Sequence, residues 1–339
     1  MTEGQKGILE KAGIADATDV RRYGSGHINE TYKVETASGT RYILQRVNTS
    51  IFDERLLEAN VMRVTEFLKS KGVKSLEVVA YESPWRVYRF LEGYTSRDVV
   101  EEPSQAYDVG RAFAKFQNDL ADIPPPRLDD IIPKFHDTPD RLRQLDEAAA
   151  KDIGGRLAGI AAEMAFVDTW RERAGRIVGL MASGAIPERV THNDTKINNV
   201  MIDAEGNSVV IDLDTTMPGS ALFDFGDMVR TATAAAAEDE ADLSKVFSKR
   251  EYFEALARGY LEGAKFLNAA ERENLVFSGM LATFEVGIRF LADYLAGDTY
   301  FHTAFADHNL VRARNQFQMV KSLESQRSDY ESIVNSFSV

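Results

Sequence analysis

One short stretch of the chain concentrates polar side chains of the kind used in phosphoryl transfer. His192, Asp194, Lys196 and Asn199 follow one another closely, and Asp212 comes directly after the apolar segment SVVI. Phosphoryl transfer needs a carboxylate that orients the attacking hydroxyl, cations that face the developing charge, and oxygen ligands for a divalent metal ion. The residues from His192 to Asp212 therefore predict the catalytic core of an ATP-dependent kinase.

Each polar residue of this stretch has an expected role. Asp194 is the predicted base, and Lys196 is long enough to reach the transferring γ-phosphate. Asn199 and Asp212 offer hard oxygen ligands to Mg²⁺, and Asp214 is a candidate second carboxylate for the metal. A turn could explain any one of these Asp or Asn residues. The complete set, followed by a strand and a carboxylate, favours catalysis.

The same stretch resembles a known superfamily. Its H-x-D-x(4)-N loop, followed by I-D-x-D, is similar to the motif of the aminoglycoside phosphotransferase and choline kinase superfamily, which shares its fold with protein kinases. Within it, the similarity to N-acetylhexosamine 1-kinases is carried by THNDTKINNV, VIDLDTTMPG, DFGD, RYILQRVN and EVGIRFLADYLAGDTYF. The resemblance implies an α+β, two-lobed fold with a β-rich lobe, a mainly helical lobe and ATP between them. The change from the strand WRVYRFL to helical periodicity places the boundary near Leu91, so we expect lobes at 1–91 and 92–339.

The letters Asp224-Phe225-Gly226 spell the metal-binding motif of protein kinases at a different place. Asp224 lies 30 residues after Asp194, whereas Asp212 lies 18 residues after it, at the end of the predicted hairpin strand. We therefore assign the metal to Asp212. The resemblance implies that Asp224 accepts hydrogen bonds from the backbone of the catalytic loop, and we expect His192 to brace that loop by a hydrogen bond.

A glycine-containing turn precedes the first predicted strands. Gly24, Ser25 and Gly26 lie in YGSGHINETYKV, where glycine allows backbone to approach phosphate. The turn equally suits an ordinary hairpin, and only the catalytic stretch favours a loop that covers a nucleotide. The segment from Arg89 through Leu91 to Gly93 follows a later predicted strand, and we expect it to form the hinge that contacts adenine.

The strand YILQRV is the expected source of a phosphate-binding side chain. The resemblance implies a basic residue here that pairs with a helical glutamate, for which Glu58 is available. Because side chains alternate along a strand, Gln45 and Arg46 cannot both face the nucleotide. Arg46 is favoured by its charge, and Gln45 is the alternative.

A later helix carries Glu285, Arg289 and Asp293 at four-residue spacing. Spacing alone favours a solvent-exposed ladder of salt bridges. The resemblance to N-acetylhexosamine 1-kinases instead implies that Arg289 and Tyr300 bind the sugar acceptor. Arg289 also distinguishes such an acceptor from a cationic one, which would require acidic groups or an aromatic cage.

Periodicity predicts the elements that position these residues. Residues 20–48 are expected to form strands, and apolar residues at helical spacing predict a helix from Asp53 to Gly72. VKSLEVVAYE and WRVYRFLEG read as strands, the ADIPPPRLDDIIP segment as a loop, and 251–266 and 271–296 as helices.

Bulk properties limit the class of protein. The chain has 339 residues, no cysteine, and a net charge of −13, which disfavours nucleic acid and anionic membranes as partners. No secretory signal or run of about 18 apolar residues is present in the sequence, so we expect a cytoplasmic protein. Oligomeric state is not indicated.

These observations combine into one prediction. The chain is expected to phosphorylate the anomeric hydroxyl of an N-acetylhexosamine with ATP and Mg²⁺, giving a sugar 1-phosphate and ADP. The alternatives are a kinase of another small alcohol, such as choline, homoserine or an aminoglycoside, and a nucleotide-binding regulator without turnover.

Overall fold

The structure is a computed structural model that describes residues 1–24 and 28–337. The chain forms two compact units, each built from three segments. Unit 1 comprises Met1–Ser96, Asp119–Pro133 and Asn199–Pro218, and unit 2 comprises Arg97–Asn118, Lys134–Asn198 and Gly219–Val339. Both units are therefore discontinuous in sequence, whereas the predicted lobes, 1–91 and 92–339, are continuous.

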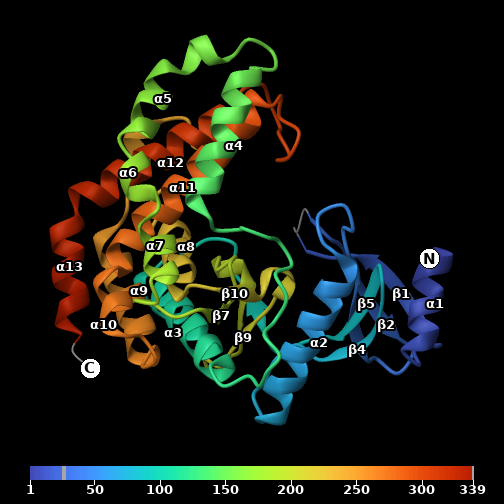
Figure 1. The fold of residues 1–339 in the computed structure, drawn as a ribbon. Coiled ribbons are helices and arrows are strands. Elements are labelled where there is room, and N and C mark those ends of the chain that lie inside the picture. The colour runs from blue at the N-terminus through green and yellow to red at the C-terminus, as the bar shows by residue number, and fades with distance from the viewer. Residues whose placement is uncertain (25–27, 338–339) are drawn as a thin grey trace. The chain divides into compact units, whose positions relative to one another are not determined.

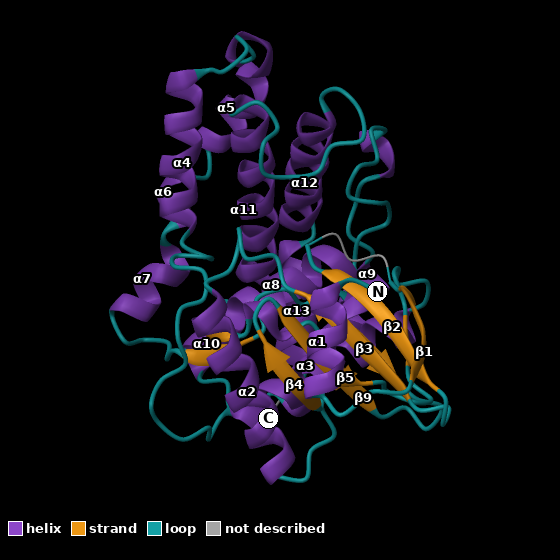
Figure 2. Ribbon diagram, turned by 90° about the vertical axis from the view of Figure 1, so that its right-hand side faces the viewer, coloured by secondary structure: helices purple, strands orange, loops and turns teal. Residues whose placement is uncertain are grey.

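Unit 1 contains a five-stranded antiparallel sheet in the order β1-β2-β3-β5-β4. The strands are β1 (Ala17–Arg22), β2 (Glu30–Thr36), β3 (Arg41–Arg46), β4 (Val78–Glu82) and β5 (Trp85–Arg89). They confirm the strands predicted from the alternating segments, and Figure 2 shows them in orange. Helix α1 (Glu3–Lys11), which periodicity did not predict, begins at a capping box formed by Thr2 and Gln5. Its Ile8 joins Val34 and Leu44 in the core of this unit.

Asn60 holds the three segments of unit 1 together. It lies in α2 (Glu54–Ser70), which confirms the helix predicted after Asp53. Its side-chain Nδ2 donates to the carbonyls of Asp129 at 2.9 Å and Thr216 at 3.1 Å, and its Oδ1 accepts from the Asp129 amide at 3.0 Å. One buried amide thus ties the proline-containing loop and the 199–218 segment to α2, because a buried amide needs partners for both its donor and its acceptor.

A small hairpin in unit 1 carries the predicted metal ligands. Strands β8 (Val200–Ile202) and β9 (Ser208–Val210) pair in antiparallel register, and β6 (Thr95–Ser96) pairs with β8. The Ile211 amide donates to the Asn199 carbonyl at 2.9 Å, so the hairpin pairing continues one residue beyond β9. The predicted strand before Asp212 is therefore present. The other short elements in and next to the catalytic stretch are β7 (Arg189–Thr191), which belongs to unit 2, η2 (Ile197–Asn199), η3 (Leu213–Thr215) and β10 (Met217–Gly219).

Unit 2 is helical and is organised around α11 (Leu275–Leu295), which packs against α4, α8 and α12. The helices are α3 (Pro103–Leu120), α4 (Thr138–Lys151), η1 (Leu157–Ile160), α5 (Ala161–Asp168), α6 (Arg171–Ala174), α7 (Arg176–Ala182), α8 (Ala221–Ala232), η4 (Leu243–Lys245), α9 (Arg250–Gly263), α10 (Ala269–Glu273), α12 (His308–Ser325) and α13 (Arg327–Ser336). Helices α9, α10 and α11 confirm the two late helices predicted from periodicity. Figure 1 shows α11 and α12 side by side in orange and red.

Helix α11 is long and apolar enough to cross a membrane by length and composition. In this protein, however, 83% of its apolar window is buried. Its aromatic residues contribute to the core, where Phe277 and Phe284 stack on Trp170. The apolarity of α11 is thus explained by its position at the centre of a helical unit.

Gly226 explains why the letters DFG occur in α8. A Cβ at this position would collide with the Ser278 carbonyl of α11 and would lie 2.9 Å from the Ala282 Cβ. Glycine therefore allows α8 and α11 to approach closely. Asp224, Phe225 and Gly226 are buried helical residues of unit 2, and helix packing explains the glycine among them.

Candidate active site

Asp194 and Lys196 form an accessible ion pair in the loop after β7. The Lys196 Nζ lies 3.0 Å from the Asp194 Oδ2, and their side chains are 40% and 27% exposed. A carboxylate with this exposure can accept a hydrogen bond from the hydroxyl group of a substrate that arrives from solvent. The ammonium group beside it can bind phosphate oxygens. The structure thus places the predicted base and the predicted phosphate-facing cation together.

Asp224 fixes the backbone of the catalytic loop. Its Oδ2 accepts from the His192 amide at 2.9 Å, and its Oδ1 accepts from the Asn193 amide at 2.7 Å. Gln117 Nε2 donates to the same carboxylate at 2.7 Å. Complete burial raises the pKa of Asp224, although these donors act in the opposite direction. The expectation that Asp224 supports the loop is confirmed.

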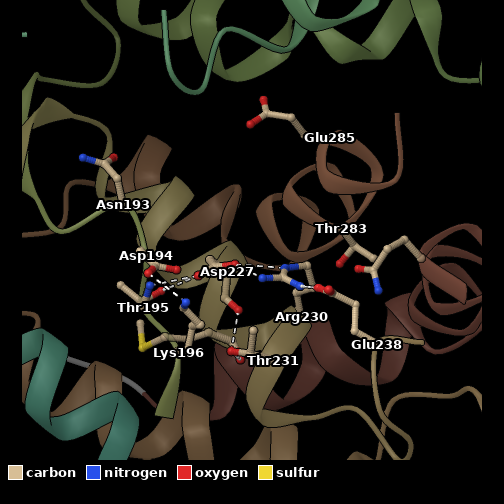
Figure 3. A network of polar contacts seen from close by, with 12 residues as sticks. Asn193, Asp194, Thr195, Lys196, Asp227, Arg230, Thr231, Glu238, Thr283 and Glu285 are labelled. Carbon is tan, nitrogen blue, oxygen red and sulfur yellow. Dashed lines mark hydrogen bonds and ion pairs between the residues drawn. The ribbon is translucent and has the colours of Figure 1, made fainter. Parts of the chain in front are cut away.

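A second buried carboxylate, Asp227, holds the backbone at Thr195, the residue between Asp194 and Lys196. Its Oδ2 accepts from the Thr195 amide at 2.8 Å, and its Oδ1 lies 2.8 Å from a guanidinium nitrogen of Arg230. Arg230 in turn pairs with Glu238 at 2.7 Å, and Figure 3 shows this chain of contacts beside Asp194 and Lys196. Burial alone would raise the pKa of Asp227, but Arg230 outweighs it and lowers that pKa.

His192 braces the loop from inside. Its ring is buried edge-on between Phe113 and Phe116, and its Nδ1 accepts from the Asp194 amide at 3.3 Å. Asn193 adopts φ +64°, a conformation that costs energy for a residue with a Cβ. The Asp224 and His192 hydrogen bonds on its two sides compensate for that strain, so Asp194 is held in one orientation.

Within unit 1, Asn199 and Asp212 are candidate ligands for a divalent cation. The hydrogen bond from Ile211 to the Asn199 carbonyl places the two residues at the same end of the β8–β9 hairpin. Asp212 adopts φ +58°, and its side chain is exposed. Among residues 1–24 and 28–337, no three His, Cys, Asp or Glu side chains form a metal-binding group. One carboxylate and one amide oxygen instead suit Mg²⁺, which commonly keeps phosphate and water ligands as well.

Asp214 contacts an arginine, and its assignment to the metal stays a prediction. Its Oδ1 lies 2.6 Å from the Arg86 Nη1, its Oδ2 accepts from the Arg86 Nη2 at 2.9 Å, and Asn29 Nδ2 donates to the same Oδ2 at 2.7 Å. Both side chains of the ion pair are buried, at 1% and 4% exposure. Because the guanidinium occupies both oxygens, the structure favours Asp214 as the anchor of the segment that carries Asp212.

Gln45 and Arg46 point to different faces of their strand, and which of them faces the nucleotide stays a prediction. Gln45 Oε1 accepts from the Arg86 Nε at 3.0 Å, so Gln45 shares a face of unit 1 with Asp214. Arg46 points the other way, is exposed, and pairs with Glu30 at 3.4 Å. The predicted partner Glu58 is half-buried in α2. Strand alternation and burial, rather than charge, decide which side chain faces inward.

The remaining predicted nucleotide-binding residues also lie in unit 1. Gly24 follows β1 and has φ +78°, which suits glycine, whereas Ser25 and Gly26 lie outside the described residues. Arg89 ends β5 and pairs with Glu77 at 3.3 Å. Leu91 is 8% exposed, and Gly93 follows it with φ +80°. This segment supplies an apolar side chain and a turn, as a hinge against adenine would require.

The predicted acceptor residues lie in unit 2 among aromatic rings. The Arg289 Cζ lies 5.3 Å from the Phe135 ring centroid and 5.7 Å from that of Phe301. Tyr300 is 59% exposed and contacts Phe301 edge-on. Its amide donates to the Asp293 Oδ1 at 2.8 Å. The structure therefore brings Arg289 and Tyr300 to the same aromatic cluster.

Glu285 and Asp293 are buried, so the expectation of a solvent-exposed salt-bridge ladder is wrong. Glu285 is 1% exposed and contacts His136 Nδ1 at 2.7 Å. Asp293 is 5% exposed and accepts from the amides of the loop that contains Tyr300. Four-residue spacing aligns side chains on one helix face but leaves open what covers that face.

Three residues of the site were missed by sequence reasoning. Arg86 contacts the predicted residue Asp214, Asp227 accepts from the Thr195 amide between Asp194 and Lys196, and His136 contacts the carbonyl oxygen of Asn193 before Asp194. A charged residue in the middle of the apolar strand WRVYR was a usable signal for Arg86, since a buried charge requires a partner. Asp227 follows Asp224 by three residues, so the two share a helix face. His136 carried no signal in its own neighbourhood.

Comparison with known proteins gives one consistent result. Residues 19–270 match the phosphotransferase enzyme family, APH. A choline/ethanolamine kinase family protein from Mesorhizobium loti superposes with a TM-score of 0.61 at 18% identity, covering 98% of each chain. A microcompartment-associated aminopropanol kinase gives 0.62 at 18% identity and 94% of each chain. An amicoumacin kinase in complex with AMP-PNP and Ca²⁺ gives 0.57 at 15% identity, covering 96% of this chain and 94% of that one.

Proposed function

Because the chain belongs to the phosphotransferase enzyme family, we propose that it is an ATP-dependent kinase of N-acetylhexosamines such as GlcNAc or GalNAc. The product would be the sugar 1-phosphate, with ADP released in the cytoplasm. The observation that carries the kinase assignment is Asp194, a partly exposed carboxylate paired with Lys196 on a loop whose backbone is held by two buried aspartates.

The chain's own groups divide the work of the reaction. Asp194 accepts a hydrogen bond from the attacking hydroxyl and orients it, and the anomeric hydroxyl is acidic enough for a carboxylate to suffice. Lys196 faces the negative charge of the transferring phosphoryl group. Asn199 and Asp212 would hold Mg²⁺, which when bound neutralises phosphate charge. Arg86 and Asn29 keep Asp214, and with it the adjoining Asp212 segment, in place.

The sugar part of the proposal rests on Arg289, Tyr300 and the rings around them. Sugars are commonly held by aromatic faces and by donors that meet their oxygens, and both are present here. The similar structures named above include kinases of choline, ethanolamine and aminopropanol, whose acceptors carry amines. A guanidinium such as that of Arg289 repels such an acceptor, which favours a neutral sugar.

ADP release with a panel of acceptors tests the proposal. GlcNAc and GalNAc are expected to stimulate it more than glucose, galactose, choline, ethanolamine or homoserine, and phosphorus NMR should identify a 1-phosphate. Asp194→Asn should lower kcat about 100- to 10,000-fold while ATP still binds. Asp168→Asn, which changes an exposed carboxylate of the same unit, serves as the control.

Each alternative predicts a different outcome of this panel. Preference for an amino alcohol would replace the sugar assignment with the choline-kinase type of activity. ATP binding without ADP release for any acceptor would indicate a nucleotide-binding regulator. Full activity in Asp194→Asn would refute the assignment of the base.

A further inference from the structure

Phe135 in unit 2 carries two guanidinium groups. The Arg289 Cζ lies 5.3 Å from its ring centroid, and the Arg141 Cζ lies 6.0 Å from the same centroid. Arg141 belongs to α4 and Arg289 to α11, so two helices that pack together each contribute one cation. Arg141 belongs to none of the motifs described above.

Neither guanidinium has a carboxylate at ion-pair distance within residues 1–24 and 28–337. Arg141 donates from Nε and Nη2 to the Phe135 carbonyl at 3.2 and 2.8 Å, and from Nη1 to the Gln144 Oε1 at 3.0 Å. Burial, together with the positive charge of Arg289, lowers the pKa of Arg141. The hydrogen-bond acceptors of Arg141 are thus neutral, while the buried Glu285 carboxylate acts electrostatically on both guanidinium groups without an ion pair. Two cations facing one such carboxylate leave a net positive local charge.

A short series of contacts connects these cations to the catalytic loop inside the same unit. Glu285 lies one helical turn before Arg289 and contacts His136 Nδ1 at 2.7 Å. His136 Nε2 lies 3.3 Å from the carbonyl oxygen of Asn193, the residue before Asp194. The cluster of Arg141 and Arg289 is therefore connected, through Glu285 and His136, to the loop that carries the predicted base.

We propose that Arg141 helps to select the acceptor and forms a cationic acceptor subsite with Arg289. This proposal rests on the proposed function. This subsite binds a neutral sugar through a carbonyl oxygen such as that of an acetamido group. It selects against acceptors that carry an ammonium group. The physical reason is that guanidinium N–H groups are donors only, so they match a carbonyl oxygen and repel a cation.

GlcNAc and glucosamine provide a matched pair of ligands, because they share one ring and differ at the acetylated nitrogen. Their dissociation constants would be measured by calorimetry at pH 6, where glucosamine is cationic, and their kcat/KM values by ADP release. Wild type should bind GlcNAc in preference to glucosamine. Arg141→Gln should lower that preference about three- to tenfold, as expected for one charge at a partly solvated distance.

Two further variants separate charge from folding. Arg141→Lys keeps the charge and should retain most of the preference. Arg143→Gln removes an exposed arginine of the same helix that pairs with Asp140 and Glu147, and it should leave the preference unchanged. A preference that Arg141→Gln does not alter, or that Arg143→Gln alters equally, overturns the assignment of Arg141.

The outcomes also distinguish the subsite from the proposed function. GlcNAc binding that depends on Arg141 without any 1-phosphate would refute the function and support the subsite. Formation of the 1-phosphate with an unchanged preference in Arg141→Gln would refute the subsite alone. Tighter binding of glucosamine or choline than of GlcNAc, or no binding of either sugar, would overturn the subsite.

Discussion

Replacing Arg86 with methionine should strongly destabilise unit 1. The guanidinium lies 2.6 and 2.9 Å from the two oxygens of Asp214 and also donates to Gln45. Burial alone would lower the pKa of Arg86, but the Asp214 carboxylate outweighs it and raises that pKa. The variant leaves a buried carboxylate whose remaining described partner is Asn29.

The expected magnitude follows from burial. Two unit charges about 4 Å apart at an effective dielectric constant of about 20 interact by about 4 kcal/mol. Breaking a buried pair by removing one partner costs about 3–5 kcal/mol for the same reason. We therefore expect the unfolding free energy to fall by about 4 kcal/mol and the melting temperature by roughly 10 °C.

Urea denaturation and scanning calorimetry would measure this loss. Arg89→Met is the matched control, because Arg89 lies on the same strand and pairs with Glu77, but the two side chains are 47% and 46% exposed. Such a surface pair is worth at most about 1 kcal/mol. Since Arg86→Met/Asp214→Leu removes both charges, it should regain part of the lost stability. A loss in Arg86→Met no greater than in Arg89→Met would refute the reasoning.

Three other expectations concern unit 2. Gly226→Ala should cost about 2–4 kcal/mol in urea denaturation, because its Cβ collides with Ser278. His136→Gln should lower kcat about 10- to 100-fold with little change in ATP affinity, because His136 positions Asn193 beside the base. The folded-state pKa of Asp227 is lowered, so the ionised carboxylate stabilises the folded protein fully above its unfolded pKa of about 4. This contribution to the free energy of unfolding is lost as the pH falls through the folded pKa. The free energy of unfolding should therefore depend less on pH between pH 7 and pH 3 in Asp227→Asn.

Each of these expectations has its own control. Gly179→Ala should be nearly neutral, because nothing lies within 4 Å of its added Cβ. Equal effects of the two glycine variants would contradict the packing argument. An unchanged kcat in His136→Gln would show that the loop does not depend on that contact, and an unchanged acid dependence in Asp227→Asn would exclude Asp227 as its source.

Local features of this protein could be predicted from its amino-acid sequence. The pattern from His192 to Asp212 predicted a loop and then a hairpin strand that ends at Asp212. The structure has both features. The helix after Asp53 was predicted equally well. These features depend on neighbours within a few residues, so periodicity and turn chemistry are sufficient to find them.

Contacts between side chains that are distant in sequence became clear only in the folded protein. Arg86 and Asp214 are 128 residues apart and form a buried contact. Arg86 also donates to Gln45, so Gln45 rather than Arg46 is the inward-facing residue of β3. In unit 2, helical spacing alone favoured a solvent-exposed salt bridge at Glu285. The folded protein instead buries Glu285 against His136. Alternation along a strand or helix defines two faces, but packing against distant segments determines which face is buried.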